Sequence, residues 1–318
     1  MVFFRGSVSG GEFASDYQQS PLSFKGVNDH VLICGSSGSG KSLFAHKLFP
    51  DPASLILFKP DPEFSDVPFL SSVKMADFFR FGAQDISDSY LYSLGMDMTG
   101  IMAASLVPVL RGALEQSAHF EQFFKSLESL TFDHLVSTVA SVIRSHFLIL
   151  STLYIQKNKR GRPPVSPIQS YGKINLKVNL AGLGTFRSEF AAELLLRKYY
   201  SSIGKDLGTL FIDEFHHVSR ERSIVDTLLR EFRSSGQLVG ITQNLSDVAP
   251  SMLSNFGNIL VGRSINPDDM KILASLSYNK YGSPVLPDLV SSLPKYVFLN
   301  LTDFLANTSE YPYYRWYD

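Results

Sequence analysis

The sequence predicts an α/β fold built on a parallel sheet. Short apolar runs alternate along the chain with segments of helical periodicity, which is the pattern of β-α-β connectivity. A loop rich in glycine and serine follows the first of these runs and precedes a helix-forming segment, so a phosphate-binding turn is expected there. The composition, 44% hydrophobic and 19% charged residues in 318, is that of an ordinary globular protein with a sizeable core.

The expected strands share a short apolar run that ends at a turn signal or a polar residue. They lie at 31–34, 54–60, 173–180, 208–213, 237–242, 258–262 and 296–301. Helices are expected at 41–49, 187–202 and 220–235, and Gly236 is expected to end the last of these in a left-handed conformation. Residues 1–318 are predicted to form a single domain in which 1–29 are an N-terminal arm.

A mainly helical insertion is expected at residues 66–171. Its segments 104–130 and 132–156 carry apolar residues at helical spacing. Residues 91–110 are apolar enough to consider as a membrane span, but Asp97, two glycines and a proline interrupt them. A buried pair of helices is therefore expected there. The insertion ends in a basic, proline-rich loop at 157–167.

Charge and cysteine content narrow the class of protein. The net charge is −1, from 29 basic and 30 acidic residues, so contact with nucleic acid would depend on local patches. The single cysteine, Cys34, excludes an internal disulfide and is expected to be buried and unreactive within its apolar run. The N-terminal residues do not have the pattern of a signal peptide. A soluble protein of the cytoplasm is expected.

The segment Gly35–Ser42 matches the pattern G-x-x-x-x-G-K-[ST] of phosphate-binding loops. Its glycines let backbone N–H groups face a phosphate, and the following helix presents its positive N-terminus to the same charge. Lys41 is expected to reach the β- and γ-phosphates of ATP, and the Ser42 hydroxyl to bind Mg²⁺. A chance Gly/Ser turn is the alternative, and the flanking strand and helix argue against it. The expected nucleotide-binding residues are Gly35, Ser36, Ser37, Gly38, Ser39, Gly40, Lys41 and Ser42.

Two adjacent acids, Asp213 and Glu214, close the apolar run at 208–213. Because ligands of α/β sheets bind at the carboxyl ends of the strands, these acids are expected beside the phosphate-binding loop. Asp213 is expected to hold Mg²⁺ together with Ser42, and Glu214 to act as the general base for an attacking water. The alternative is that the two acids only cap the following helix.

Other classes of nucleotide-binding protein fit the sequence less well. A switch GTPase needs N-K-x-D, but Asn279-Lys280 is followed by Tyr281. The signature of an ABC ATPase should lie between the two motifs, whereas the similar run at 7–13 precedes both. A small-molecule kinase would not require the Asp-Glu pair. The remaining class is an ATPase with a catalytic glutamate, which usually performs mechanical work.

Residues 228–273 resemble the HerA–FtsK superfamily of hexameric DNA-pumping ATPases. The shared pattern is Arg-Glu-x-Arg on a helix, a strand ending in Thr-Gln, and a later strand with arginine near its end. Segments 55–64, 179–196 and 213–218 also look like pieces at corresponding places in HerA-like and conjugation ATPases. The residues that match the pattern are Arg230, Glu231, Arg233, Thr242, Gln243 and Arg263.

The resemblance implies a RecA-like P-loop ATPase core, with the additional strand and catalytic glutamate, that carries the helical insertion. It implies ATP and Mg²⁺ as cofactors and a homo-oligomeric ring, expected to be a hexamer, that moves double-stranded DNA in genome packaging or DNA transfer. A capsid, membrane or nuclease partner would anchor the ring, and a viral member would work in the host cytoplasm or the virion. The alternative is an ATPase motor for protein secretion or virion assembly that does not act on DNA.

Two further roles are expected of residues in this pattern. Gln243 is expected at the tip of a strand beside both motif-bearing strands, where its amide can bond the γ-phosphate and the attacking water. Arg233, and next Arg230 or Arg263, is expected to complete the site of a neighbouring subunit by stabilising phosphoryl charge. The alternatives are a polar strand end for Gln243 and a solvated helix face for the arginines.

The basic loop supplies the candidate DNA contacts Lys157, Lys159, Arg160 and Arg162. Its run Arg-Gly-Arg-Pro at 160–163 also matches the core of an AT-hook, which lies in the minor groove. A solvated loop tip is the alternative. The aromatic tail at 311–318, which holds the only tryptophan, is expected to pack on a neighbouring subunit rather than to stack on bases.

Overall fold

The computed structural model describes most of the chain and groups it into two compact units. One unit comprises residues 1–68 and 203–318, and the other comprises 69–202. The described residues are 3–9, 12–20, 29–49, 52–60, 62–64, 81–96, 100–129, 134–153, 177–201, 208–234, 236–306 and 313–316.

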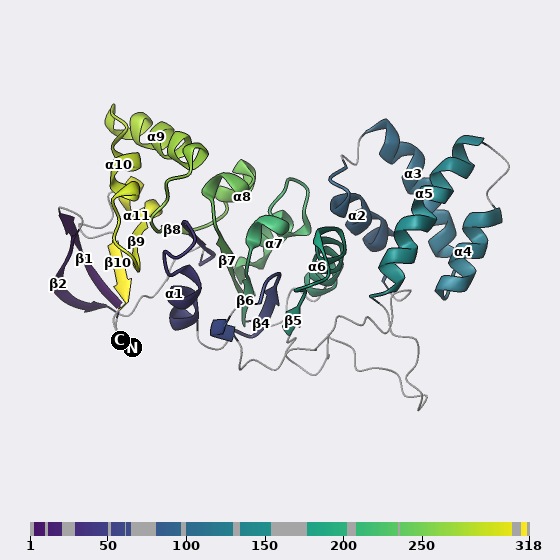
Figure 1. The fold of residues 1–318 in the computed structure, drawn as a ribbon, viewed down its shortest axis with the longest axis horizontal. Coiled ribbons are helices and arrows are strands. Elements are labelled where there is room, and N and C mark those ends of the chain that lie inside the picture. The colour runs from purple at the N-terminus through teal and green to yellow at the C-terminus, as the bar shows by residue number, and fades with distance from the viewer. Residues whose placement is uncertain are drawn as a thin grey trace. The chain divides into compact units, whose positions relative to one another are not determined.

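The first unit contains a sheet whose central strands are all parallel (Figure 1). Their order is β8-β3-β7-β6-β4, with every neighbouring pair parallel. The expected place of the strand before Gln243 is confirmed, because β7 lies between the two motif-bearing strands β3 and β6. The bounds are Val31–Cys34 for β3, Ser54–Leu57 for β4, Gly208–Ile212 for β6, Gly236–Thr242 for β7 and Asn258–Val261 for β8.

Burial explains why these short segments form strands. All four residues of β3 and all four of β4 are buried, as is usual for parallel strands covered on both faces. Cys34, at the end of β3, is paired in register with Thr242 and Val261. Burial raises the pKa of the Cys34 thiol far above its usual value, so the expected unreactive, buried cysteine is confirmed.

Four antiparallel strands extend the sheet beyond β8, in the order β9-β10-β1-β2. The strand β10 is the aromatic tail, and it pairs with β9 on one side and β1 on the other. Residues 313–316 use their backbone groups within their own sheet, and the expectation that this tail packs on a neighbouring subunit stays a prediction. The bounds are Val297–Asn300 for β9, Tyr313–Trp316 for β10, Phe3–Ser9 for β1 and Glu12–Ser20 for β2.

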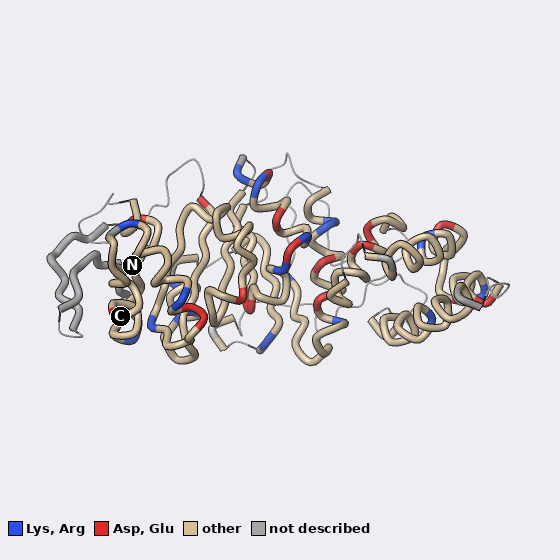
Figure 2. Tube along the Cα trace, turned by 90° about the horizontal axis from the view of Figure 1, so that it is seen from above, with Lys and Arg blue, Asp and Glu red and all other residues tan. Residues whose placement is uncertain are grey.

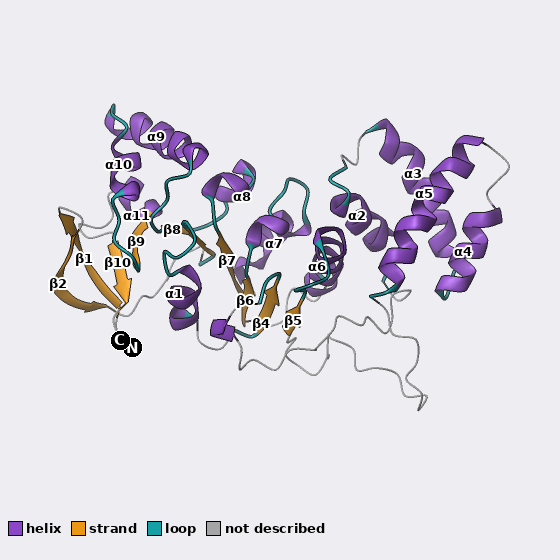
Figure 3. Cartoon of the chain, in the orientation of Figure 1, coloured by secondary structure: helices purple, strands orange, loops and turns teal. Residues whose placement is uncertain are grey.

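Helices alternate with the parallel strands of this unit (Figure 3). Ser223 caps α7 by accepting a hydrogen bond from the Val225 N–H at 3.2 Å, so this helix begins later than expected. Gly236 does not end it, because this glycine is the first residue of β7 and lacks a positive φ. The helices are α1 Lys41–Leu48, η1 Pro62–Phe64, η3 Phe215–His217, α7 Ile224–Glu231, η4 Phe232–Ser234, η5 Leu245–Asp247, α8 Pro250–Leu253, α9 Pro267–Tyr281, α10 Val285–Ser291 and α11 Leu301–Ala306.

The second unit is mainly helical, as the sequence predicts for much of it (Figure 3). The apolar stretch 91–110 contains the end of one helix and the start of the next, which confirms a helix pair, but the pair is not buried throughout, because Met102 is 72% exposed. No helix among the described residues is both long and apolar enough to span a membrane. The bounds expected for the insertion, 66–171, stay a prediction. The elements are α2 Ala83–Ser93, α3 Ile101–Glu115, α4 Phe120–Ser129, α5 His134–Ser151, β5 Lys177–Asn179 and α6 Thr185–Tyr200.

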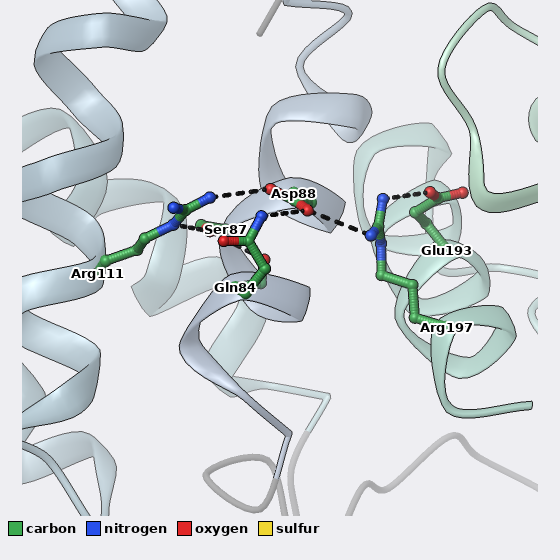
Figure 4. Close-up of polar contacts among 6 residues, drawn as sticks. All are labelled: Gln84, Ser87, Asp88, Arg111, Glu193 and Arg197. Atoms are coloured by element: carbon green, nitrogen blue, oxygen red, sulfur yellow. Dashed lines mark hydrogen bonds and ion pairs between the residues drawn. The ribbon is translucent and has the colours of Figure 1, made fainter. Parts of the chain in front are cut away.

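A network of ion pairs joins three helices inside this second unit (Figure 4). Asp88 on α2 contacts Arg111 of α3 at 3.3 Å and Arg197 of α6 at 3.2 Å. Arg197 also contacts Glu193, one turn earlier on α6, at 3.0 Å. Because a buried carboxylate is costly to leave unpaired, this network holds α2 between α3 and α6.

Candidate active site

The phosphate-binding loop connects β3 to α1 and depends on its glycines. Gly38 and Gly40 have φ angles of 80° and 93°, in the left-handed region that favours glycine. A Cβ on Gly40 would also lie 2.2 Å from the ring of Tyr296. The backbone can therefore make this turn, and pack against Tyr296, only with glycine at position 40.

Backbone and side-chain hydrogen bonds fix the loop against neighbouring strand ends. The Ser36 N–H and hydroxyl both donate to the Arg263 carbonyl, at 2.8 and 2.9 Å. The Tyr296 N–H donates to the Ser39 carbonyl at 3.0 Å. The loop is thus held by residues that follow β8 and precede β9.

Lys41 lies at the start of α1 with its ammonium directed back over the loop. Its Nζ donates to the Ser36 carbonyl at 3.0 Å. Burial lowers the pKa of Lys41 below its usual value, although the nearby carboxylates of Glu214 and Asp213 act in the opposite direction. A partly buried ammonium with so few neutralising contacts favours an anionic ligand.

Asp213 and Glu214 directly follow β6, so they lie at the carboxyl end of this strand. The Asp213 N–H donates to the Ile56 carbonyl at 3.0 Å, so this residue continues the pairing with β4. Glu214 has a φ of 49°, a left-handed conformation that costs a non-glycine residue about 1 kcal/mol. Such local strain persists where the surrounding structure imposes it, often at functional sites.

The Glu214 carboxylate accepts hydrogen bonds from two other segments and lies near a histidine. Lys59, just after β4, contacts Oε1 at 2.6 Å. Gln243, just after β7, donates from Nε2 to Oε1 at 3.1 Å and to Oε2 at 3.4 Å. His216 Nδ1 lies 3.3 Å from Oε2. Burial alone would raise the pKa of Glu214, but the hydrogen bonds from Lys59 and Gln243 outweigh it and lower the pKa, so the carboxylate is ionised at neutral pH.

One cavity of about 290 Å³ brings these groups together at the carboxyl ends of β3, β6 and β7. Its volume is at the lower end of the range for small-molecule sites. The residues expected to hold Mg²⁺, to activate water and to sense it all line this cavity, together with part of the glycine loop. The lining residues are Ser37, Gly38, Lys41, Ser42, Lys59, Pro60, Pro62, Asp213, Glu214, Ile241, Thr242 and Gln243.

The donors around the cavity fit a magnesium nucleotide. The Ser42 hydroxyl and the Asp213 carboxylate supply the oxygen ligands that Mg²⁺ prefers. The Thr242 hydroxyl is buried and has no hydrogen-bond partner among the described residues, although it lines the cavity. A buried polar group of this kind is usually satisfied by a ligand or by water.

The two preferred candidate finger residues do not line the cavity. Arg233 lies in η4, before β7 begins, and donates to the Leu229 carbonyl at 3.3 Å. Arg230 pairs with Asp226 at 2.7 Å on the exposed face of α7. Both arginines lie near the amino-terminal end of β7, whereas the cavity lies at its carboxyl end. Because β7 has seven residues, about 20 Å separate these two ends. Arg263 follows β8 at the cavity edge, where its backbone carbonyl anchors the loop.

The candidate DNA contacts of the basic loop, Lys157, Lys159, Arg160 and Arg162, lie outside the described residues. In the part of the chain that the structure describes, basic and acidic positions are interspersed (Figure 2).

Sequence reasoning did not identify two of the cavity residues, Lys59 and Thr242, as contributors to the site. Lys59 lies two residues after an apolar strand, whereas Asp213 and Gln243 come directly after theirs. A rule that collects polar residues at the carboxyl ends of all parallel strands would have found it. The family pattern contains Thr242 but gives it no role of its own.

No family model and no curated protein matches this sequence. Among solved structures, the chain is similar to VirB4 of Thermoanaerobacter pseudethanolicus, with a TM-score of 0.64 and 13% identity over 94% of this chain and 93% of that one. It is also similar to the bacterial conjugative coupling protein TrwB with bound sulphate, with a TM-score of 0.58 and 16% identity over 90% of this chain and 84% of that one. A structure of the plasmid coupling protein TrwB with ADP and Mg²⁺ is similar as well, with a TM-score of 0.57 and 16% identity over 85% of this chain and 81% of that one. The expected RecA-like P-loop ATPase fold is therefore confirmed.

Proposed function

We propose that this chain is an ATPase that hydrolyses ATP with Mg²⁺ in the cavity at the carboxyl ends of β3, β6 and β7. The observation that carries the proposal is the convergence of a glycine-held lysine, an acid pair and a glutamine on one cavity. Each of these groups comes from a different part of the chain, and each has a separate task in phosphoryl transfer to water. Similarity in fold to a protein with bound ADP and Mg²⁺ supports the choice of ligand.

Each cavity residue has a role that follows from its chemistry. Lys41 and the loop N–H groups bind the phosphates, and Ser42 and Asp213 hold Mg²⁺, which neutralises charge on the phosphates when it is bound. Glu214 accepts a proton from the attacking water, because its ionised carboxylate faces the cavity. Gln243 bonds the same water and the terminal phosphate, and its strand relays their presence to the sheet.

We infer that the active form is a ring in which a neighbouring subunit supplies a further cation to the transferred phosphate. Arg233, or next Arg230, supplies that cation to the neighbouring site across the subunit boundary. Both lie at the opposite edge of their own sheet and cannot reach their own cavity, which is the arrangement that a finger acting in trans requires. A hexamer is the expected ring, as in the HerA–FtsK superfamily that the sequence resembles.

The work of the motor is the translocation of double-stranded DNA, in DNA transfer or in genome packaging by a virus. The similarity to a conjugative coupling protein supports this assignment, and so does the basic loop at 157–167. The second candidate is a motor that moves or assembles protein. Basic and acidic positions are interspersed along the described residues, which favours keeping this candidate (Figure 2).

The test is ATP turnover by the purified chain with and without duplex DNA, over a series of protein concentrations. Turnover per subunit is expected to rise with protein concentration as rings assemble, and to rise again with DNA. Lys41→Ala is expected to abolish turnover, since it removes the phosphate-binding ammonium. Arg233→Ala is expected to abolish it too, but should be rescued in mixtures with Lys41→Ala subunits, which supply an intact arginine.

Each outcome of this test has a defined meaning. Turnover that ignores DNA would favour the protein motor. Turnover per subunit that is independent of concentration would contradict the ring. A Glu214→Gln variant that hydrolyses ATP at the unaltered rate would contradict the assigned general base.

A further inference from the structure

Among the described residues that line the cavity, Lys59 is the one cation to which the proposed function gives no task. It follows β4, and its Nζ lies 2.6 Å from Oε1 of Glu214. Its side chain is 54% exposed, whereas that of Glu214 is 11% exposed. The lysine therefore reaches a buried carboxylate from the open side of the cavity, on a stem that is free to turn.

The contacts of Glu214 leave an attacking water little access to its carboxylate. Oε1 accepts hydrogen bonds from both Lys59 and Gln243. Oε2 has Gln243 Nε2 at 3.4 Å and His216 Nδ1 at 3.3 Å. A water that approaches Oε1 must therefore compete with an ammonium for this oxygen. We use the term resting site for this arrangement, in which Lys59 is bound to Glu214.

A bound triphosphate would offer Lys59 a second anion. The cavity that Lys59 lines is also lined by Lys41 and Ser42, so the terminal phosphate of a nucleotide held by the loop would enter the space beside Lys59. A phosphate carries more charge and more acceptor oxygens than a carboxylate, and charge-assisted hydrogen bonds to it are strong. A diphosphate lacks the group that reaches this space.

We propose that Lys59 is a positioning residue that holds Glu214 in the resting site and moves to the terminal phosphate of a bound nucleoside triphosphate, which leaves Glu214 free to bond the attacking water. This inference rests on the proposed ATPase function. It assigns the two lysines of the cavity separable tasks. Lys41, which donates to the loop carbonyl of Ser36, serves any bound nucleotide, and Lys59 responds only to the third phosphate.

The experiment measures the affinity of the full chain for two ligands by calorimetry, each with Mg²⁺: ADP and a β,γ-methylene analogue of ATP. The variants are Lys59→Met, which keeps the length of the stem without its charge, and Lys59→Arg, which keeps the charge. Lys59→Met is expected to bind the analogue about tenfold more weakly, which corresponds to one charge-assisted hydrogen bond. Its affinity for ADP should be unchanged, and Lys59→Arg should restore the affinity for the analogue.

Steady-state turnover gives a second readout that a merely structural role would not produce. Lys59→Met is expected to raise KM for ATP and lower kcat, because the terminal phosphate loses a contact and the water loses an aligned site. Lys59→Arg is expected to recover both. Circular dichroism of the variants checks that the fold is intact, and a half-exposed lysine is a mild site for substitution.

Two results would overturn the inference while the proposed function survives. Equal weakening of ADP and the analogue by Lys59→Met would mean that Lys59 only maintains the cavity. Unaltered affinity for both, in a chain whose nucleotide binding is abolished by Lys41→Ala, would mean that Lys59 does not meet the third phosphate. A wild-type chain that binds neither nucleotide would overturn the proposed function and this inference together.

Discussion

The cavity of the first unit and the helical packing of the second each contain a buried carboxylate contacted by cations, but the two carboxylates differ in the exposure of their partners. Glu214 meets Lys59, whose side chain is 54% exposed and lines a cavity. Asp88 meets Arg197, whose side chain is 14% exposed and which also contacts Glu193 (Figure 4).

This difference separates a contact that can exchange from one that cannot. Separating Arg197 from Asp88 would remove one of the two cations, Arg111 and Arg197, that contact this buried carboxylate, which is unfavourable. Lys59 can leave Glu214 and remain hydrated, because its head group reaches the cavity and solvent. The same ionic chemistry therefore serves packing in one unit and, in our proposal, a reaction in the other.

The largest expected effect is on the exchangeable carboxylate. Glu214→Gln should lower kcat for ATP about 10²- to 10⁴-fold, the usual contribution of a general base. Affinity for the β,γ-methylene analogue should persist, because the phosphate-binding loop is unchanged. Steady-state turnover and calorimetry measure the two quantities. A parallel loss of binding would mean that Glu214 supports the cavity rather than the chemistry.

The buried network of the helical unit should show the reverse behaviour. Asp88→Ala leaves Arg111 and Arg197 without their shared carboxylate, so the free energy of unfolding should fall by about 3 kcal/mol. Urea denaturation measures this loss. The folded protein is expected to bind nucleotide with unchanged affinity. A large change in affinity would contradict the assignment of Asp88 to packing and Glu214 to the reaction.

The buried, neutral His30 makes the stability of the first unit depend on pH. Burial, helped by the charge of Arg233, lowers the pKa of His30 from 6.5 to about 4. The unfolded chain thus binds a proton more readily than the folded one between these values, and stability is lost as pH falls. We expect His30 to destabilise the fold by about 2 kcal/mol between pH 7 and pH 5.

Denaturation at several pH values checks this expectation. The matched control is His30→Asn, which has an oxygen to accept the Leu238 N–H that now bonds Nδ1 at 3.0 Å. This variant does not titrate in the window, so its stability should depend less on pH than that of the wild type. Equal pH dependence of the two would show that another group is responsible.

The smallest effect is expected for a fully exposed ion pair. Glu121 and Lys125 lie one turn apart on α4, with side chains that are 73% and 72% exposed. Because water and salt screen such a pair, Glu121→Ala should leave the unfolding midpoint in urea nearly unchanged. A loss as large as that of Asp88→Ala would show that burial does not explain the difference between the two networks.

Local patterns predicted the parallel core well. The runs that became β3, β6 and β7 are short, apolar and bounded by polar residues, and a strand that is buried on both faces requires little else. The loop before Lys41 and the acids after β6 were also predicted, since strand direction alone places both at one edge of the sheet.

Other elements depended on partners far away in the chain. The strand β10 pairs with β1, more than three hundred residues earlier, and no local signal indicates this pairing. The helix α2 is buried along most of its length although it contains Ser87, Asp88 and Ser89, so its burial extends beyond an apolar stripe. Asp88 contacts Arg111 and Arg197 on other helices, which the sequence could not identify.

By itself, the sequence determined the phosphate-binding loop, the acid pair and the glutamine, because each is a short motif whose chemistry is set by adjacent residues. Only the tertiary structure decided that Lys59 contacts Glu214, 155 residues away, and that Arg230 and Arg233 lie at the far edge of their own sheet. The physical reason is strand order. Which polar residues share a cavity depends on which strands become neighbours, and that order is chosen by burial over the whole sheet.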